Sequence, residues 1–330
     1  MSGELTFIKK ISGKSSLIPL IFLFLFFHAG TGMGAESENS ETGYNTIKPP
    51  DVFLAVQIVE KNLELVRLSM GAPKANPLDI RVNKAAPYDA YFQALTLFQK
   101  ANRLSFEIIR QREILPPLST KAVHPCDVLR LVNGAQQSVR KVTAELNILW
   151  DDAEGIRDES KTSTDVFKII MATNRQLNLL LERRFAPSDV YQLVTVGIGY
   201  ASIQLSRLPS TTRIPDEPPF EINKKPSDVY FLLLECLDII SQMYEQADLE
   251  KLDIDSGHID EHNITPSDVF DVASLIVARL DYLYKYFGSS RAPRKAFYPG
   301  RKFPSDVFQR TMILKAQLKQ INQAFQTKGF

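Results

Sequence analysis

Two histidines and a glutamate form the strongest candidate for chemistry in this sequence. His258, Glu261 and His262 stand in the order H-x-x-E-H, which on a helix can supply two zinc ligands and a catalytic base. Here the motif lies between Gly257 and Asn263, outside any stretch of helical periodicity. We therefore interpret it as a solvated acidic loop. His258, Glu261 and His262 are kept as weak metal candidates, and neither a catalytic residue nor a cofactor is predicted.

A second candidate is a basic stretch between residues 290 and 302. It combines five cations with two aromatic rings: Arg291, Arg294, Lys295, Phe297, Tyr298, Arg301 and Lys302. Cations between aromatic residues can bind phosphates, sulfated or uronic sugars, or lipid headgroups. The acidic residues 248–261 could instead pair with this stretch. We predict that the seven basic and aromatic residues form a partner-binding surface.

A third candidate is a recurring aspartate in a Pro-x-Asp-Val frame or a close variant. It occurs at Asp51, Asp89, Asp127, Asp165, Asp189, Asp228, Asp268 and Asp306. Converging carboxylates could bind a cation, but without one they would repel each other. An acidic residue in the first turn of a helix also offsets the positive end of the helix dipole. We interpret all eight as structural helix starts.

The spacing of these aspartates predicts the architecture. Neighbouring copies are separated by 38, 38, 38, 24, 39, 40 and 38 residues, so four copies before the short interval match four copies after it. A period of this length indicates an internal repeat. The chain is therefore predicted to be a tandem duplication of a four-copy unit, with domains at residues 49–185 and 186–330.

Each copy has the pattern of one amphipathic helix. Counting from the aspartate, apolar residues recur at +1, +5, +8, +12, +15 and +19, as from Val52 to Met70 in the first copy. Steps of four and three place them on one face of a helix of about 20 residues. The N-cap could be the aspartate, the residue before it, or the residue before the proline. We expect an all-α protein with eight such helices in two bundles; an open α-solenoid is the structural alternative.

The linkers leave the direction of the helices open. Most contain about 16 to 18 residues, including prolines, and an extended chain of that length can run along a whole helix. Consecutive helices can therefore be parallel or antiparallel. Only the junction at residues 185–187 is short enough to predict an antiparallel hairpin, between the fourth and fifth helices.

The N-terminus has the pattern of a secretory signal peptide. Basic residues precede the apolar residues 17–27, and small residues follow near position 35. We predict a signal peptide at residues 1–35, a flexible segment at residues 36–48 and no permanent membrane span after cleavage. Only Cys126 and Cys236 are present, which excludes a disulfide-rich scaffold but leaves one bridge possible.

Composition sets the class of function we expect. The chain has 330 residues, 44% of them hydrophobic and 23% charged, with a net charge of +1, typical of a globular protein. This balance gives no general attraction for nucleic acid. We expect an exported, periplasmic or secreted, non-enzymatic binding or adaptor module for an envelope protein or an anionic envelope polymer. The alternatives are a small-molecule-binding bundle and, third, an enzyme.

Overall fold

The protein is all-α, as predicted. The computed structural model describes residues 47–75, 81–116, 123–152, 155–182, 185–208, 212–255, 261, 264–288, 293–294 and 296–328. Within these residues the helices are α2 (Pro49–Met70), α3 (Pro87–Ile109), α4 (Pro125–Glu145), α5 (Ser163–Leu180), α6 (Pro187–Leu205), α7 (Pro226–Gln246), α8 (Pro266–Tyr286) and α9 (Pro304–Lys328). None of the helices described here is long and apolar enough to cross a membrane. The predicted signal peptide and the segment up to residue 46 lie outside the described residues.

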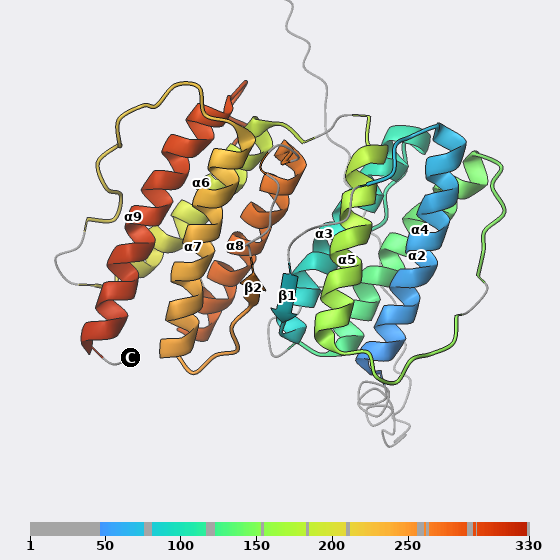
Figure 1. The fold of residues 1–330 in the computed structure, drawn as a ribbon, viewed down its shortest axis with the longest axis horizontal. Helices are drawn as coiled ribbons and strands as arrows, with labels where there is room; N and C mark the ends of the chain where they lie inside the picture. The colour runs from blue at the N-terminus through green and yellow to red at the C-terminus, as the bar shows by residue number, and fades with distance from the viewer. Residues whose placement is uncertain are drawn as a thin grey trace, which may run out of the picture. The chain divides into compact units, whose positions relative to one another are not determined.

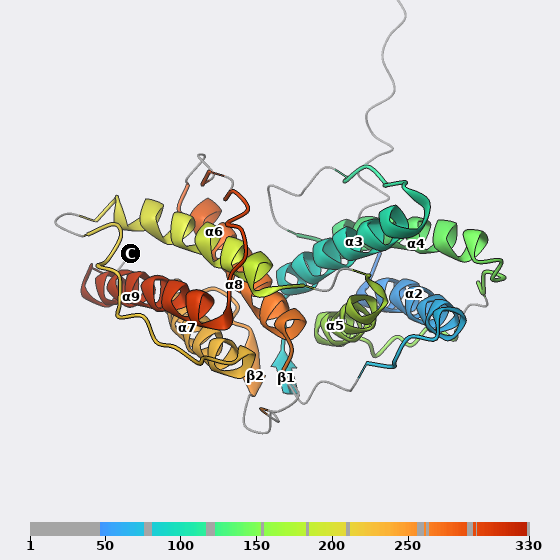
Figure 2. The ribbon, with the colours of Figure 1, turned by 90° about the horizontal axis from the view of Figure 1, so that it is seen from above.

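The eight helices form two closed bundles, one of α2 to α5 and one of α6 to α9 (Figures 1 and 2). In the first, α2 and α3 each pack against both α4 and α5. In the second, α6 and α7 each pack against both α8 and α9. Helices at equivalent places in the repeat therefore occupy equivalent corners. This arrangement is that of two helical bundles and not of an open solenoid.

The helices within each bundle are parallel. In the second bundle all four helix starts surround one small apolar space, lined by Pro187, Val190, Pro226, Val229, Pro266, Val269, Pro304 and Val307. In the first bundle, the N–H of Ala85 before α3 donates to Oγ1 of Thr164 in α5 at 3.0 Å, and Arg157 before α5 pairs with Asp51 in α2 at 2.6 Å. Each linker must therefore return along the length of its bundle.

The repeated aspartate is the third residue of its helix in every copy. Its carboxylate accepts the backbone N–H of the residue before the first helical position, from Lys48 to Asp51 at 2.8 Å through to Phe303 to Asp306 at 2.8 Å. Of the three registers that the sequence left open, the structure has the one with the N-cap before the proline. Parallel helices bring four positive dipole ends together, and one carboxylate per helix offsets them.

The predicted hairpin at residues 185–187 is wrong. Helix α5 ends at Leu180 and α6 begins at Pro187, but the two do not pack side by side. The ring of Phe185 instead stacks on Phe270 of α8 with centroids 3.9 Å apart, and Lys100 and Arg103 of α3 lie over it. At this contact the chain passes from the first bundle to the second instead of turning back along α5.

Two short strands also connect the halves. β1 (Arg81–Lys84) precedes α3, and β2 (Asp253–Asp255) precedes α8; they pair antiparallel. The two bundles accordingly belong to one compact unit. The sequence did not predict these strands, because each lies inside a linker and finds its partner about 170 residues away along the chain.

Candidate functional site

One repeat position is buried in all eight copies, and in most of them its side chain makes a polar contact outside its own helix. It is +11 from the aspartate: Asn62, Lys100, Ser138, Gln176, Tyr200, Ile239, Arg279 and Gln317. In seven copies its side chain bonds to another helix or a linker. In the eighth copy, Ile239 has no polar group. This position could have been noticed in the sequence, because a polar residue recurs there, beside the apolar stripe, in most copies.

The amides at this position hold the long linkers. Nδ2 of Asn62 donates to the carbonyl of Asp151 at 2.8 Å, and the N–H of Asp151 donates back to Oδ1 of Asn62 at 3.0 Å. Gln176 bonds to the linker before β1, and its repeat equivalent Gln317 donates to the carbonyl of Arg213. Asn102, two residues beyond this position, holds Glu113 through a similar pair. The linkers are therefore fixed at defined points on the bundles.

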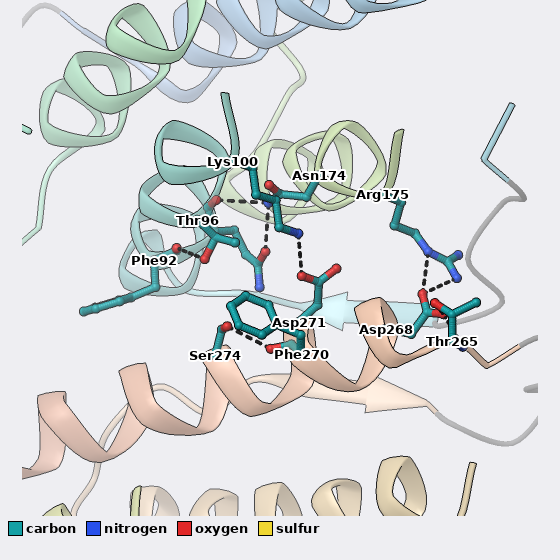
Figure 3. A network of polar contacts seen from close by, with 11 residues as sticks. Phe92, Thr96, Lys100, Asn174, Arg175, Thr265, Asp268, Phe270, Asp271 and Ser274 are labelled. Atoms are coloured by element: carbon teal, nitrogen blue, oxygen red, sulfur yellow. Dashed lines mark hydrogen bonds and ion pairs between the residues drawn. The ribbon is translucent and has the colours of Figure 1, made fainter. Parts of the chain in front are cut away.

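The two cations at this position join the bundles. Nη2 of Arg279 lies 2.6 Å from Oδ2 of Asp89, and Nζ of Lys100 lies 2.6 Å from Oδ1 of Asp271. A third pair, Arg175 with Asp268, is 2.7 Å long. Figure 3 shows the second and third pairs beside Asn174. The bundles therefore meet through opposite charges on α3, α5 and α8.

The charges in this contact are strongly desolvated. Burial raises the pKa of Asp89, opposed by Arg279, and burial lowers the pKa of Lys100, opposed by Asp271. Such groups can indicate a functional site. The cavity lined by Arg175, Asp268 and Asp271, however, has a volume of only about 30 Å³, close to that of one water molecule. We interpret the charges as determinants of how the bundles dock.

A larger groove lies on the second bundle between α7, α9 and β2. Its volume is about 540 Å³, and its lining combines apolar residues with six charges: Phe231, Leu234, Glu235, Leu237, Asp238, Ile239, Ser241, Lys251, Leu252, Asp253, Ile254, Lys315 and Lys319. Pockets of this volume are large enough for ligands. Sequence analysis did not identify this groove, because its walls come from two helices and a linker.

The predicted basic and aromatic surface lies on the linker between α8 and α9. Arg291 and Lys295 fall outside the described residues. Phe297 is 93% exposed, and Tyr298 is half exposed. The linker beside them is anchored, because Nε2 of Gln192 donates to the carbonyl of Ala296 at 2.7 Å and Pro293 packs on Gly199. Phe297 is thus displayed to solvent from a fixed segment.

The described cations of this surface differ in their surroundings. Arg301 lies over the ring of Phe303 at 5.1 Å. Lys302 lies over the ring of Tyr191 at 4.8 Å and pairs with Asp306 at 3.6 Å. Lys161 lies over Phe53 at 5.0 Å in the first bundle, at the equivalent repeat positions. This repetition indicates that Lys302 closes the end of its own bundle.

The acidic linker, residues 248–261, does not pair with the basic linker, residues 290–302, in the described parts of the two. Glu250 lies 3.8 Å from Lys84, and Asp253 accepts a hydrogen bond from Asn83. Both contacts connect the acidic linker to the first bundle, since Lys84 belongs to β1. Among the residues described, no ion pair joins it to the basic linker.

The weak metal candidates fall largely outside the described residues. His258 and His262 lie outside them, and Glu261 is exposed. Over the described ranges, no group of three potential metal ligands comes together. Both cysteines are free, with Cys236 buried in α7 and Cys126 partly exposed at the start of α4.

The glycines of α6 make room for neighbours. A Cβ on Gly197 would lie 3.3 Å from Cδ2 of Leu314 in α9, and one on Gly199 would lie 2.9 Å from Cβ of Pro293. Two glycines this close together in a helix could leave a pocket beside it. Close packing by α9 and by the basic linker fills that space instead.

Comparisons with known proteins give no further guidance. No protein-family model matches the chain, and no curated protein or solved structure matches it either.

Proposed function

We propose that the protein is an exported, non-enzymatic binding or adaptor module that works in the cell envelope, periplasmic or secreted. The observation that carries this proposal is Phe297, a 93% exposed aromatic side chain on a linker that Gln192 and Gly199 hold in place. An exposed aromatic on a fixed segment loses little entropy on binding and buries a large apolar area.

The charges of this linker indicate which kind of partner to expect. Arg294 and Arg301 belong to the same linker as Phe297 and Tyr298. Cations beside aromatic rings favour a partner with anionic groups, either an envelope protein with an acidic surface or an anionic envelope polymer. Because exposed charges are screened over about 8 to 10 Å at physiological salt, this contact should weaken as salt rises.

The test is site-specific photocrosslinking in the native cells. A photoreactive phenylalanine analogue at Phe297 should give one dominant crosslinked partner. The matched control is the same analogue at Phe220, which is also exposed but lies on the linker between α6 and α7. Equal crosslinking at both positions, or none at Phe297, contradicts the proposal.

Binding assays with the purified protein and partner then distinguish the contribution of the charges from that of the aromatic ring. Arg294→Ser with Arg301→Ser should reduce the salt dependence of binding, whereas Phe297→Ala should weaken binding at every salt concentration. Lys302→Ala should lower stability, like Lys161→Ala, and leave binding unchanged. A uronic-acid polymer used as the probe distinguishes a polymer partner from a protein.

A small-molecule-binding bundle is the second candidate. The groove between α7, α9 and β2 favours it, because about 540 Å³ is within the usual range of ligand sites. A thermal-shift screen of small ligands tests it, and stabilisation that is lost on Ser241→Trp would assign a ligand to this groove.

A further inference from the structure

The wall of the groove formed by β2 contains backbone as well as side chains. Lys251, Leu252, Asp253 and Ile254 all line it. Asp253 and Ile254 belong to β2, and Lys251 and Leu252 directly precede it. Successive residues of a strand point to opposite faces, so the lining by both Asp253 and Ile254 brings the edge of β2 to the groove. β2 pairs only with β1 in the two-stranded sheet of the described residues. No strand of the described residues pairs with its other edge, and an edge without a paired strand can accept a further one.

The opposite wall is a helix with an apolar surface. Phe231, Leu234 and Ile239 of α7 line the groove. Ile239 occupies the repeat position that, in the other seven copies, bonds to a segment outside its own helix. Among the eight copies, only Ile239 makes no polar contact from this position, and Ile239 lines the groove. A strand edge facing an apolar helix is the geometry in which extended peptides bind.

The charges of the groove are unequally satisfied. Glu235 pairs with Lys315, and Lys251 pairs with Glu245. Asp238 on α7 and Asp253 on β2 instead accept hydrogen bonds from neutral amides, those of Gln242 at 3.2 Å and Asn83 at 3.3 Å. Both carboxylates interact with Lys251 at longer range, but Lys251 pairs with Glu245, and neither Asp238 nor Asp253 has an ion pair in the described part of the chain. Each can therefore still accept a close contact from a cationic side chain.

We propose that this groove binds an extended peptide segment of a partner protein, which adds a strand to the free edge of β2 and places a Lys or Arg side chain between Asp238 and Asp253. Apolar side chains at alternate positions of the peptide pack on Phe231, Leu234 and Ile239. This site is separate from the surface around Phe297 and does not depend on it.

The experiment is a selection of ten-residue displayed peptides against the full chain. Enriched peptides should alternate apolar and polar residues and contain a Lys or Arg. Asp238→Lys should weaken a selected peptide by about tenfold or more, as expected when like charges meet in an interface. The matched control, Asp216→Lys, makes the same charge change on an exposed linker and should leave affinity within about twofold of the wild type.

Two measurements distinguish strand addition from other modes. Backbone N-methylation of the peptide should weaken binding at every second residue only, because alternate N–H groups face the neighbouring strand. Amide exchange of residues 252–255 should slow when the peptide binds. Three results overturn the proposal: peptides that bind Asp238→Lys equally well, peptides whose sensitivity to N-methylation does not alternate along the chain, and a library that yields no groove-dependent peptide.

Discussion

Nη2 of Arg279 in the second bundle lies 2.6 Å from Oδ2 of Asp89 in the first. The same oxygen accepts the N–H of Ala86 at the start of α3. One carboxylate therefore both begins a helix and joins two bundles. In the second bundle the repeat equivalent of Asp89 is Asp228, for which the described residues show only the first of these roles. Comparing Asp89 with Asp228 therefore distinguishes the stability contributed by a helix start from that contributed by a buried ion pair.

Asp89→Ala should destabilise the protein much more than Asp228→Ala. Removing one partner of a buried ion pair leaves an uncompensated charge and costs about 3 to 5 kcal/mol. Losing only a first-turn carboxylate costs about 0.5 to 2 kcal/mol. Chemical denaturation of the two variants measures both values.

A double variant tests the cause. Adding Arg279→Met to Asp89→Ala should recover stability, because it removes the unpaired buried guanidinium. Equal losses for Asp89→Ala and Asp228→Ala would show that the ion pair between the bundles contributes nothing.

Asn62 and Asn102 should each control one linker. Asn62→Leu removes both bonds to Asp151, and Asn102→Leu removes both bonds to Glu113. Leaving such groups without partners costs about 1 to 3 kcal/mol. Hydrogen exchange should accelerate at Asp151 in the first variant and at Glu113 in the second. Acceleration of both amides in each variant would indicate general loosening of the bundle.

The repeat explains which parts of the fold could be predicted. Helix number, helix faces and helix starts depend on local spacing, from the stripe beginning at Val52 to the aspartates, and the sequence contains this information directly. The direction of the helices depends on linkers long enough for either outcome. The structure shows that amides such as Asn62 and Gln317 hold these linkers along the bundles.

The candidate sites were harder to predict, because their residues meet only after folding. Asp89 and Arg279 are 190 positions apart, and the groove combines α7, α9 and β2. Polar residues at the position of Lys100 and Arg279 could have been noticed in the repeat, but not their partners. The exposed ring of Phe297 was predicted from the sequence because its signal, an aromatic among cations, is local.

Cys236 should make the stability of the protein fall at high pH. Burial raises the pKa of its thiol from 9.0 to about 12. The folded state then holds a proton that the unfolded state releases above pH 9, so stability is lost as pH rises from 9 towards 12. The loss is about 1.4 kcal/mol per pH unit. Tyrosines also titrate in this range, so the measured quantity is the difference in slope between the wild type and Cys236→Ala. Identical slopes for the two proteins would contradict the prediction.

Each bundle should fold without the other. Both are closed rings of four helices, and separation exposes Asp89, Lys100 and Arg279 to water, which relieves their desolvation. Fragments 36–185 and 186–330 should therefore each show strong helical circular dichroism and a cooperative melt. When mixed, they should associate through α3 and α8, and Arg279→Ala in the second fragment should weaken that association while its own melting temperature stays nearly unchanged. Two unfolded fragments would show instead that the bundles share a core and that the division at residues 185–186 is not a domain boundary.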